Sequence, residues 1–164
     1  MKRISALITA FAMTAGLTGC FSAQKQIEQT ADDLLSDFAT DDTAFAFEGE
    51  VGAVTIKPST DGKVHTDVSY TARGFSESIL EEILNETELK SSSDNGVFRL
   101  SFVKKGTETS IWKAVKDEHA NYNIDVKAEI TVPETMTEFT ISTNVGSVTV
   151  EDISGTMDLT SNVG

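Results

Sequence analysis

Histidines and clustered acids are the residue types most able to do chemistry, and the chain has only two histidines. His65 lies in the alternating segment Val64–Tyr70, whose period of two predicts a strand and places the imidazole on its solvent side. A site built from Asp117, His119 and Asp125 can be drawn, but it lacks the several nitrogen or sulfur ligands that transition metals prefer. We therefore expect solvated side chains here, with no metal site and no cofactor.

The acidic residues do not single out a catalytic centre. A serine hydrolase needs a nucleophile beside a base, and no Gly-x-Ser-x-Gly turn is present in the sequence. With 26 Asp and Glu residues, pairs of carboxylates are too frequent to indicate acid–base catalysis. Asp152 and Asp158 are candidates for glycoside chemistry only as outward-facing acids. We expect a protein that is not an enzyme.

One basic cluster stands out from the acidic background, and it surrounds the single tryptophan. Two interpretations are open. An exposed Trp112 and its lysines could bind an anionic polymer, lipid headgroups or a protein partner. Alternatively, Ile111, Trp112 and Val115 pack onto the sheet while the lysines stay solvated. The possible partner-binding residues are Lys104, Lys105, Trp112, Lys113 and Lys116.

The formal net charge of −13 limits the classes of partner. Nucleic acid is disfavoured, because its phosphates must be neutralised by Lys and Arg. Anionic lipid headgroups are also repelled by such a chain. Membrane attachment, where it exists, has to come from something other than an electrostatic protein surface.

The N-terminus has the pattern of an export signal. Lys2 and Arg3 precede the uncharged, mostly apolar run 4–17, which is short for a membrane-spanning helix. The following Leu17-Thr18-Gly19-Cys20 resembles the lipobox of bacterial lipoproteins. That resemblance implies cleavage before Cys20, lipidation of its thiol and a location in the cell envelope. Because Phe21 stands where an inner-membrane retention signal has Asp, it implies the outer membrane in a cell that has one.

Three domains are expected: a signal peptide over 1–19, a lipidated acidic tether over 20–43 and a β domain over 44–164. Apolar residues of the tether at helical spacing indicate a partly helical linker. The β domain begins with a strand, an Asp61-Gly62 turn and a second strand, which predict a hairpin. Ser76 is placed to start a helix over 75–86, and Asp94-Asn95-Gly96 predicts a second hairpin. Alternation resumes over 121–132 and stops at Pro133.

A short repeat closes the sequence. Asn144-Val145-Gly146 recurs 18 residues later as Asn162-Val163-Gly164, and a divergent copy with Val51-Gly52 lies 94 residues upstream. A short period with a fixed glycine predicts a parallel β-solenoid with a repeat of about 18 residues. The alternative is an antiparallel meander with recurring turns.

The order of these features over 45–164 resembles the bacterial putative-adhesin family, a domain of unknown function with β-solenoid repeats. It is carried by Val51-Gly52-x-Val54-x-Ile56, the helix and hairpins, Ile130-x-Val132-Pro133 and the Val-Gly-x-Val-x-Val repeat. The resemblance implies a mainly β fold, with N-terminal hairpins and one short helix leading into the solenoid. Members usually continue for more repeats, which implies a chain truncated after Gly164.

The function expected from these features is a membrane-anchored, non-enzymatic, adhesin-like module. It would bind or scaffold an unknown envelope protein or glycan. The alternatives are a carbohydrate-active β-solenoid enzyme and a component of an envelope-stress sensor.

Overall fold

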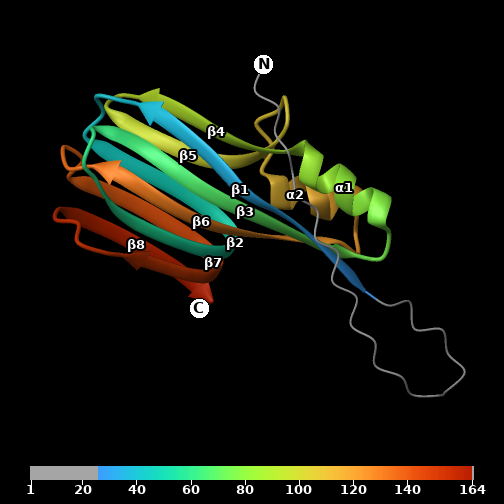
Figure 1. Ribbon diagram of the computed structural model, residues 1–164. Coiled ribbons are helices and arrows are strands. Elements are labelled where there is room, and N and C mark those ends of the chain that lie inside the picture. Colours follow the sequence, from blue (N-terminus) through green and yellow to red (C-terminus); the bar gives the residue numbers. More distant parts are fainter. Residues whose placement is uncertain (1–25, 164) are drawn as a thin grey trace, which may run out of the picture.

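The computed structural model describes residues 26–163, so the predicted signal peptide and Cys20 lie outside the described residues. Figure 1 shows one strongly twisted sheet with two short helices at one end. In chain order the elements are β1 (Ile27–Ala39), β2 (Ala44–Ser59), β3 (Lys63–Gly74), α1 (Glu77–Glu86), β4 (Thr87–Asp94), β5 (Val97–Lys104), α2 (Ile111–Glu118), β6 (Asn123–Pro133), β7 (Glu138–Val150) and β8 (Thr156–Val163).

The sheet mixes antiparallel and parallel pairs. β1 runs antiparallel to β3, β3 antiparallel to β6, and β4 antiparallel to β5. β2 is parallel to β5, β6 and β7, and β8 is parallel to β7. Strands β2, β7 and β8 therefore form a parallel stack within a mixed sheet.

A bend in the middle of β2 gives this one strand two different neighbours on the same side. Residues 44–48 pair with β5, whereas residues 52–59 pair with β6. β7 follows the other side of β2 across both halves. Gly52 lies at the bend with a φ of +146°, and a Cβ there would come within 1.7 Å of the Val126 carbonyl oxygen. Only glycine allows the two backbones to meet this closely.

The bend repeats in the next strand. Gly146 of β7 pairs with Gly52, has a φ of +142°, and a Cβ on it would meet the Gly52 carbonyl oxygen at 1.7 Å. The sequence offsets reappear as strand register: Ala44 pairs with Glu138, 94 residues on, and Glu138 pairs with Thr156, 18 residues on. The repeat thus marks strands stacked in register.

The predicted parallel β-solenoid is wrong, because the stack belongs to a mixed sheet containing antiparallel pairs. The Val-Gly recurrence arises from one bend copied in register between neighbouring strands. A mixed sheet can hold such a stack as readily as a coil can, so the glycine period does not distinguish the two architectures.

Two further expectations are corrected. β2 and β3 do not form the predicted hairpin, because β6 lies between them and pairs with both. Residues 27–39, expected within a partly helical tether, form β1 and pair with β3 along most of their length. Phe38 and Leu34 of β1 pack against the core, and this tertiary contact outweighs the weak helical spacing.

Other expectations are confirmed. α1 spans Glu77–Glu86 with Leu80 and Ile83 buried, as the apolar stripe predicted. Ser76 occupies the N-cap position, although its hydroxyl bonds to Ser78 rather than to the helix backbone. β4 and β5 form the second predicted hairpin, with Asn95 and Gly96 both at positive φ as a tight two-residue turn requires.

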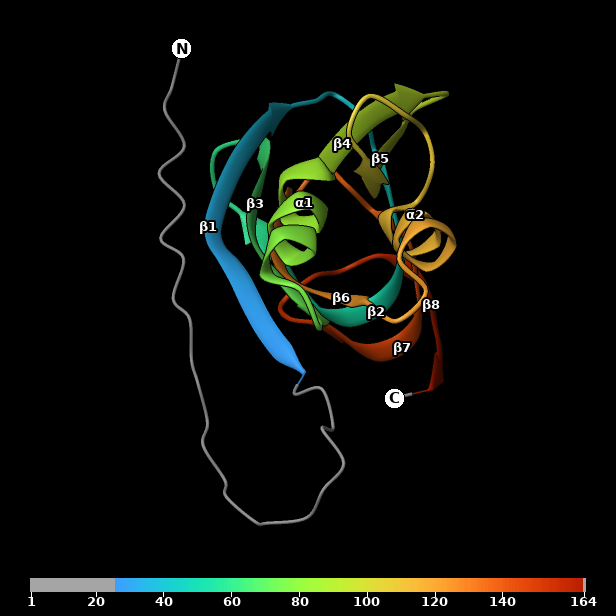
Figure 2. The same cartoon turned by 90° about the vertical axis from the view of Figure 1, so that its right-hand side faces the viewer.

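Aromatic rings from adjacent strands stack into the core. Phe45 of β2 has the ring centroids of Phe98 on β5 and of Phe139 on β7 each 6.4 Å away. Phe102 makes edge-on contacts with Phe47, Tyr70 and Trp112 at 5.7–5.9 Å. Figure 2 looks along the molecule from the helical end, where α1 and α2 lie within the curve of the sheet.

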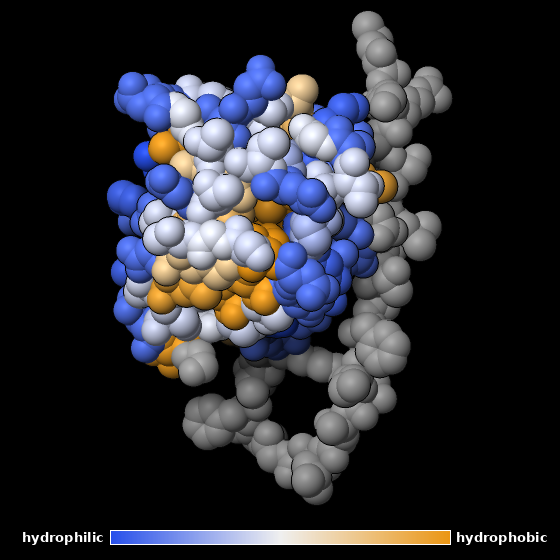
Figure 3. All heavy atoms as spheres, turned by 90° about the vertical axis from the view of Figure 1, so that its left-hand side faces the viewer, coloured by the Kyte–Doolittle hydropathy of each residue, from blue (hydrophilic) through white to orange (hydrophobic). Residues whose placement is uncertain are grey.

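The stack is incompletely covered at β8. Leu159 pairs with the fully buried Ile141 but is 46% exposed, and Val163 beside Val145 is 63% exposed. Figure 3 shows hydrophobic side chains gathered on the end of the molecule opposite the helices. There Met136 and Ile153 line a cavity of about 300 Å³.

The Gly52 contact predicts a large difference in stability between two Gly→Ala variants, each of which places alanine at a positive φ. Gly62 has a φ of +74° with open space around its Cβ position, so Gly62→Ala should cost about 1–2 kcal/mol for backbone strain alone. Gly52→Ala adds a backbone collision and should cost more than about 4 kcal/mol. Urea unfolding of both variants measures the difference, and similar losses would show that the bend tolerates a side chain.

Candidate binding cleft

A cleft of about 480 Å³ lies where α2 meets the bend of β2, the end of β3 and the start of β6. This volume falls within the range of small-molecule sites, which is roughly 300–1,000 Å³. Its lining comes from segments far apart in the sequence, so the fold assembles it. The residues are Glu50, Val51, Arg73, Trp112, Val115, Lys116, Ala120, Tyr122, Asn123, Ile124 and Asp125.

The aromatic part of the cleft is held in place by packing. Trp112 is 8% exposed and meets Phe102 edge-on at 5.9 Å. Tyr122 lies over Gly74, where an added Cβ would come within 2.0 Å of the ring, and its ring contacts His119 edge-on. Both ring positions therefore depend on neighbours that leave little freedom to move.

Trp112 also carries an unusual polar atom. Its indole Nε1 is buried and has no hydrogen-bond partner among the described residues. An unsatisfied buried donor typically costs about 1–3 kcal/mol, so native proteins usually pair it with protein, water or ligand. Trp112 lines the cleft, but its Nε1 is closed off from the accessible surface, so the unpaired donor is a cost carried by the packing of the indole.

The charged groups of the cleft are largely paired. The Arg73 guanidinium donates from Nε to Glu28 Oε2 at 2.6 Å, and its Nη1 lies 3.7 Å from Asp125 Oδ2. Glu50 accepts a hydrogen bond from the Ser110 hydroxyl at 3.2 Å. These contacts join β1, β3 and β6 on one side and tie β2 to the start of α2 on the other. They fix the orientation of the polar groups before any ligand binds.

The basic cluster expected around Trp112 is divided by the fold. Lys104 pairs with Glu86 at 3.2 Å and Glu118 at 2.5 Å, and Lys113 pairs with Asp117 one helical turn away. Lys105 and Lys116 are exposed and make no ion pair with another described residue. Of these lysines only Lys116 lines the cleft.

The burial of Ile111, Trp112 and Val115 agrees with the packed alternative for this segment. α2 was not expected from the sequence, although the spacing of those three residues fits two helical turns. The roles of Arg73, Tyr122, Asn123 and Glu50 were also missed. The adjacent Tyr122 and Asn123, which follow a turn starting at His119, were the one local signal of a binding site. Nothing near them in the sequence indicated that α2, β2 and β3 would converge there.

The remaining candidates do not form a second centre within residues 26–163. No group of three or more His, Cys, Asp or Glu side chains in this range is placed to hold a metal ion. His119 packs against Tyr122, and Asp125 faces Arg73, so the imagined Asp117–His119–Asp125 set has other contacts. Asp152 lines the smaller cavity at the opposite end, and Asp158 is exposed on β8.

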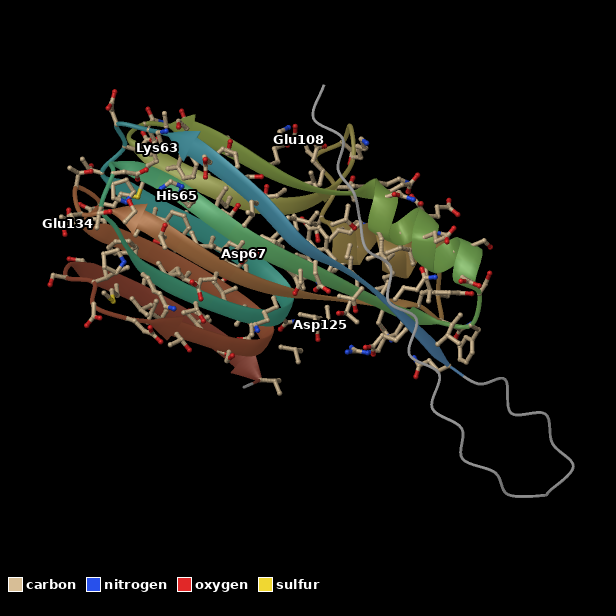
Figure 4. The ribbon with its side chains drawn as sticks, viewed as in Figure 1. Lys63, His65, Asp67, Glu108, Asp125 and Glu134 are labelled. Carbon is tan, nitrogen blue, oxygen red and sulfur yellow. The ribbon has the colours of Figure 1, made fainter. Side chains whose placement is uncertain are left out.

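His65 forms a clamp between two carboxylates at the end opposite the cleft (Figure 4). Its Nδ1 lies 2.7 Å from Asp37 Oδ1, and its Nε2 lies 2.7 Å from Asp61 Oδ1. Hydrogen bonds to Asp37 and then Asp61 raise the pKa of the imidazole, because both ring nitrogens donate only in the protonated form. The bond from His65 lowers the pKa of Asp61. The clamp ties β1 to β3.

Comparisons with known proteins give a distant likeness. No family model matches the chain, and no curated protein matches it. Two solved structures do: a putative adhesin from Parabacteroides merdae (14% identity, TM-score 0.31) and a putative cell adhesion protein from Clostridium sporogenes (12% identity, TM-score 0.37). The matches cover 70% and 77% of this chain but 38% and 50% of those proteins. At such scores the likeness carries no argument about function.

The clamp predicts a pH-dependent stability. Its contribution should be complete between the ordinary pKa of Asp61 and the ordinary pKa of His65, which are 3.8 and 6.5. It is lost as pH rises through the folded pKa of His65, and the Asp61 part is lost as pH falls through the folded pKa of Asp61. Thermal unfolding of wild type and His65→Gln across pH measures it: the difference in Tm should shrink towards alkaline pH. A constant difference would contradict a protonated clamp.

Proposed function

We propose that this chain is a lipid-anchored, non-enzymatic binding module of the bacterial cell envelope, with an adhesin-like role. The cleft beside α2 is the observation that carries the proposal. It combines a ligand-sized volume with aromatic and polar groups on a rigid framework. Such a site can hold a molecule without any chemical step.

The pairing of the cleft's acids favours binding over catalysis. A general acid or base works best when its environment leaves it poised to exchange a proton. Here Asp125 faces Arg73 and Glu50 accepts from Ser110. Those contacts orient both side chains within the cleft wall, where they can contact a ligand.

The anchor part of the proposal rests on the sequence around Cys20, since those residues lie outside the described range. No helix within residues 26–163 is both long and apolar enough to cross a membrane. With β1 beginning at Ile27, the chain from Cys20 to the sheet spans at most about 25 Å. The lipid would therefore hold the domain close to the membrane surface, in the outer membrane where the cell has one.

Metabolic labelling tests the anchor. Labelled palmitate should enter the wild-type protein and be absent from Cys20→Ala, because the cysteine thiol is the acceptor of the lipid. Ser22→Ala serves as a control two residues away and should label normally. Labelling of Cys20→Ala at the wild-type level would refute attachment at this residue.

Crosslinking in intact cells tests the binding role. The wild-type chain should retain an envelope component that is lost from the double variant Lys116→Ala/Asn123→Ala, because both exposed side chains line the cleft. Lys113→Ala is the matched control: it removes an exposed lysine of the same helix that does not line the cleft. Equal retention by all three proteins would exclude the cleft as the binding surface.

A further inference from the structure

The cleft has almost no net charge, although the chain is strongly acidic. Its lining contains two acids, Glu50 and Asp125, and two bases, Arg73 and Lys116. The formal charge of the whole chain is −13. A ligand with a net negative charge would be repelled by the surrounding protein, and one with a net positive charge would meet Arg73 and Lys116 in the lining. The charge balance therefore selects an uncharged molecule.

The lining is nevertheless rich in hydrogen-bonding groups. Asn123 offers two donors and an acceptor, and the paired Arg73 guanidinium and Asp125 carboxylate offer further positions. An uncharged molecule that uses them needs several groups able to both donate and accept. Hydroxyl groups have this property, whereas a simple hydrocarbon ligand would leave the polar lining desolvated without partners.

The aromatic side chains add the second half of the recognition. Trp112 and Tyr122 line the cleft together with the apolar Val51 and Val115. A sugar ring suits this combination, because it carries a C–H face that packs on an aromatic side chain and hydroxyls at its edge.

We infer that the cleft binds an uncharged carbohydrate, a short neutral glycan held between the aromatic side chains and the Arg73–Asp125–Asn123 rim. This inference rests on the proposed binding function and names the ligand class for the same cleft. It assigns Asn123 and Tyr122 as ligand-contacting residues. It also makes Trp112, the only tryptophan in the chain, a natural reporter of binding.

The experiment uses the full-length chain, purified in a detergent without a sugar headgroup. It is first applied to a glycan array of neutral and charged sugars and then titrated with chitotriose while Trp112 emission is recorded. The deacetylated chitosan trimer has the same backbone but is cationic, and a galacturonic acid trimer is anionic. We expect retention of neutral glycans on the array, and a saturable emission change with chitotriose but not with the two charged trimers.

Asn123→Ala should weaken the apparent affinity by about fivefold to tenfold, the loss expected for one hydrogen bond. Lys113→Ala should leave it unchanged, and both side chains are exposed, so folding is not at stake. The inference is overturned if no neutral glycan is retained on the array, if the charged trimers bind more tightly, or if Asn123→Ala binds like wild type. Should neutral glycans fail while crosslinking in cells still depends on the cleft, the ligand class is wrong and the binding function stands.

Discussion

The architecture depends on a contact between bare backbones at Gly52. The strand bends there, and its carbonyl and amide groups meet Val126 on one side and Gly146 on the other at distances that exclude any side chain. The bend lets β2 pair first with β5 and then with β6. Glu50 and Val51 lie between the residues that pair with β5 and those that pair with β6, and both line the cleft. One conformational constraint thus sets both the sheet topology and one wall of the candidate site.

The remaining walls follow from the core. Phe102 contacts Phe47, Tyr70 and Trp112, so a single ring joins β2, β3, β5 and α2. Burial of Trp112 in this cluster orients α2 across the end of the sheet. The cleft is therefore the outer surface of the core rather than a loop feature, and its geometry should be as rigid as the packing that forms it.

Local patterns in the sequence predicted local structure well. α1 and the β4–β5 hairpin formed where the apolar stripe and Asn95-Gly96 indicated, and the 18- and 94-residue offsets became strand register. Pairing between distant strands was less accessible. The Asp61-Gly62 turn gave no sign that β6 would insert between β2 and β3, and β1 was read as helical because its spacing is weakly amphipathic. A glycine period reports a stacked bend, not the architecture around it.

The candidate site was the hardest part to predict, for the same reason. Of the residues that line the cleft, only Trp112 and Lys116 had been expected to bind a partner, and they were chosen as members of a basic surface. Folding pairs Lys104 and Lys113 with acids and buries the indole. What remains is a cleft of balanced charge whose other members, such as Arg73 and Tyr122, come from strand ends with no distinguishing local pattern.

The Glu28–Arg73 ion pair has a mechanical consequence. It joins the first residues of β1 to the cleft, so the chain leading to the anchor proposed at Cys20 enters the molecule beside the candidate ligand site. A pulling force between membrane and ligand would run through this corner and bypass most of the sheet. The strand pairs towards the His65 end would carry little of the load, and the hydrogen bonds between the start of β1 and the end of β3 would bear it first.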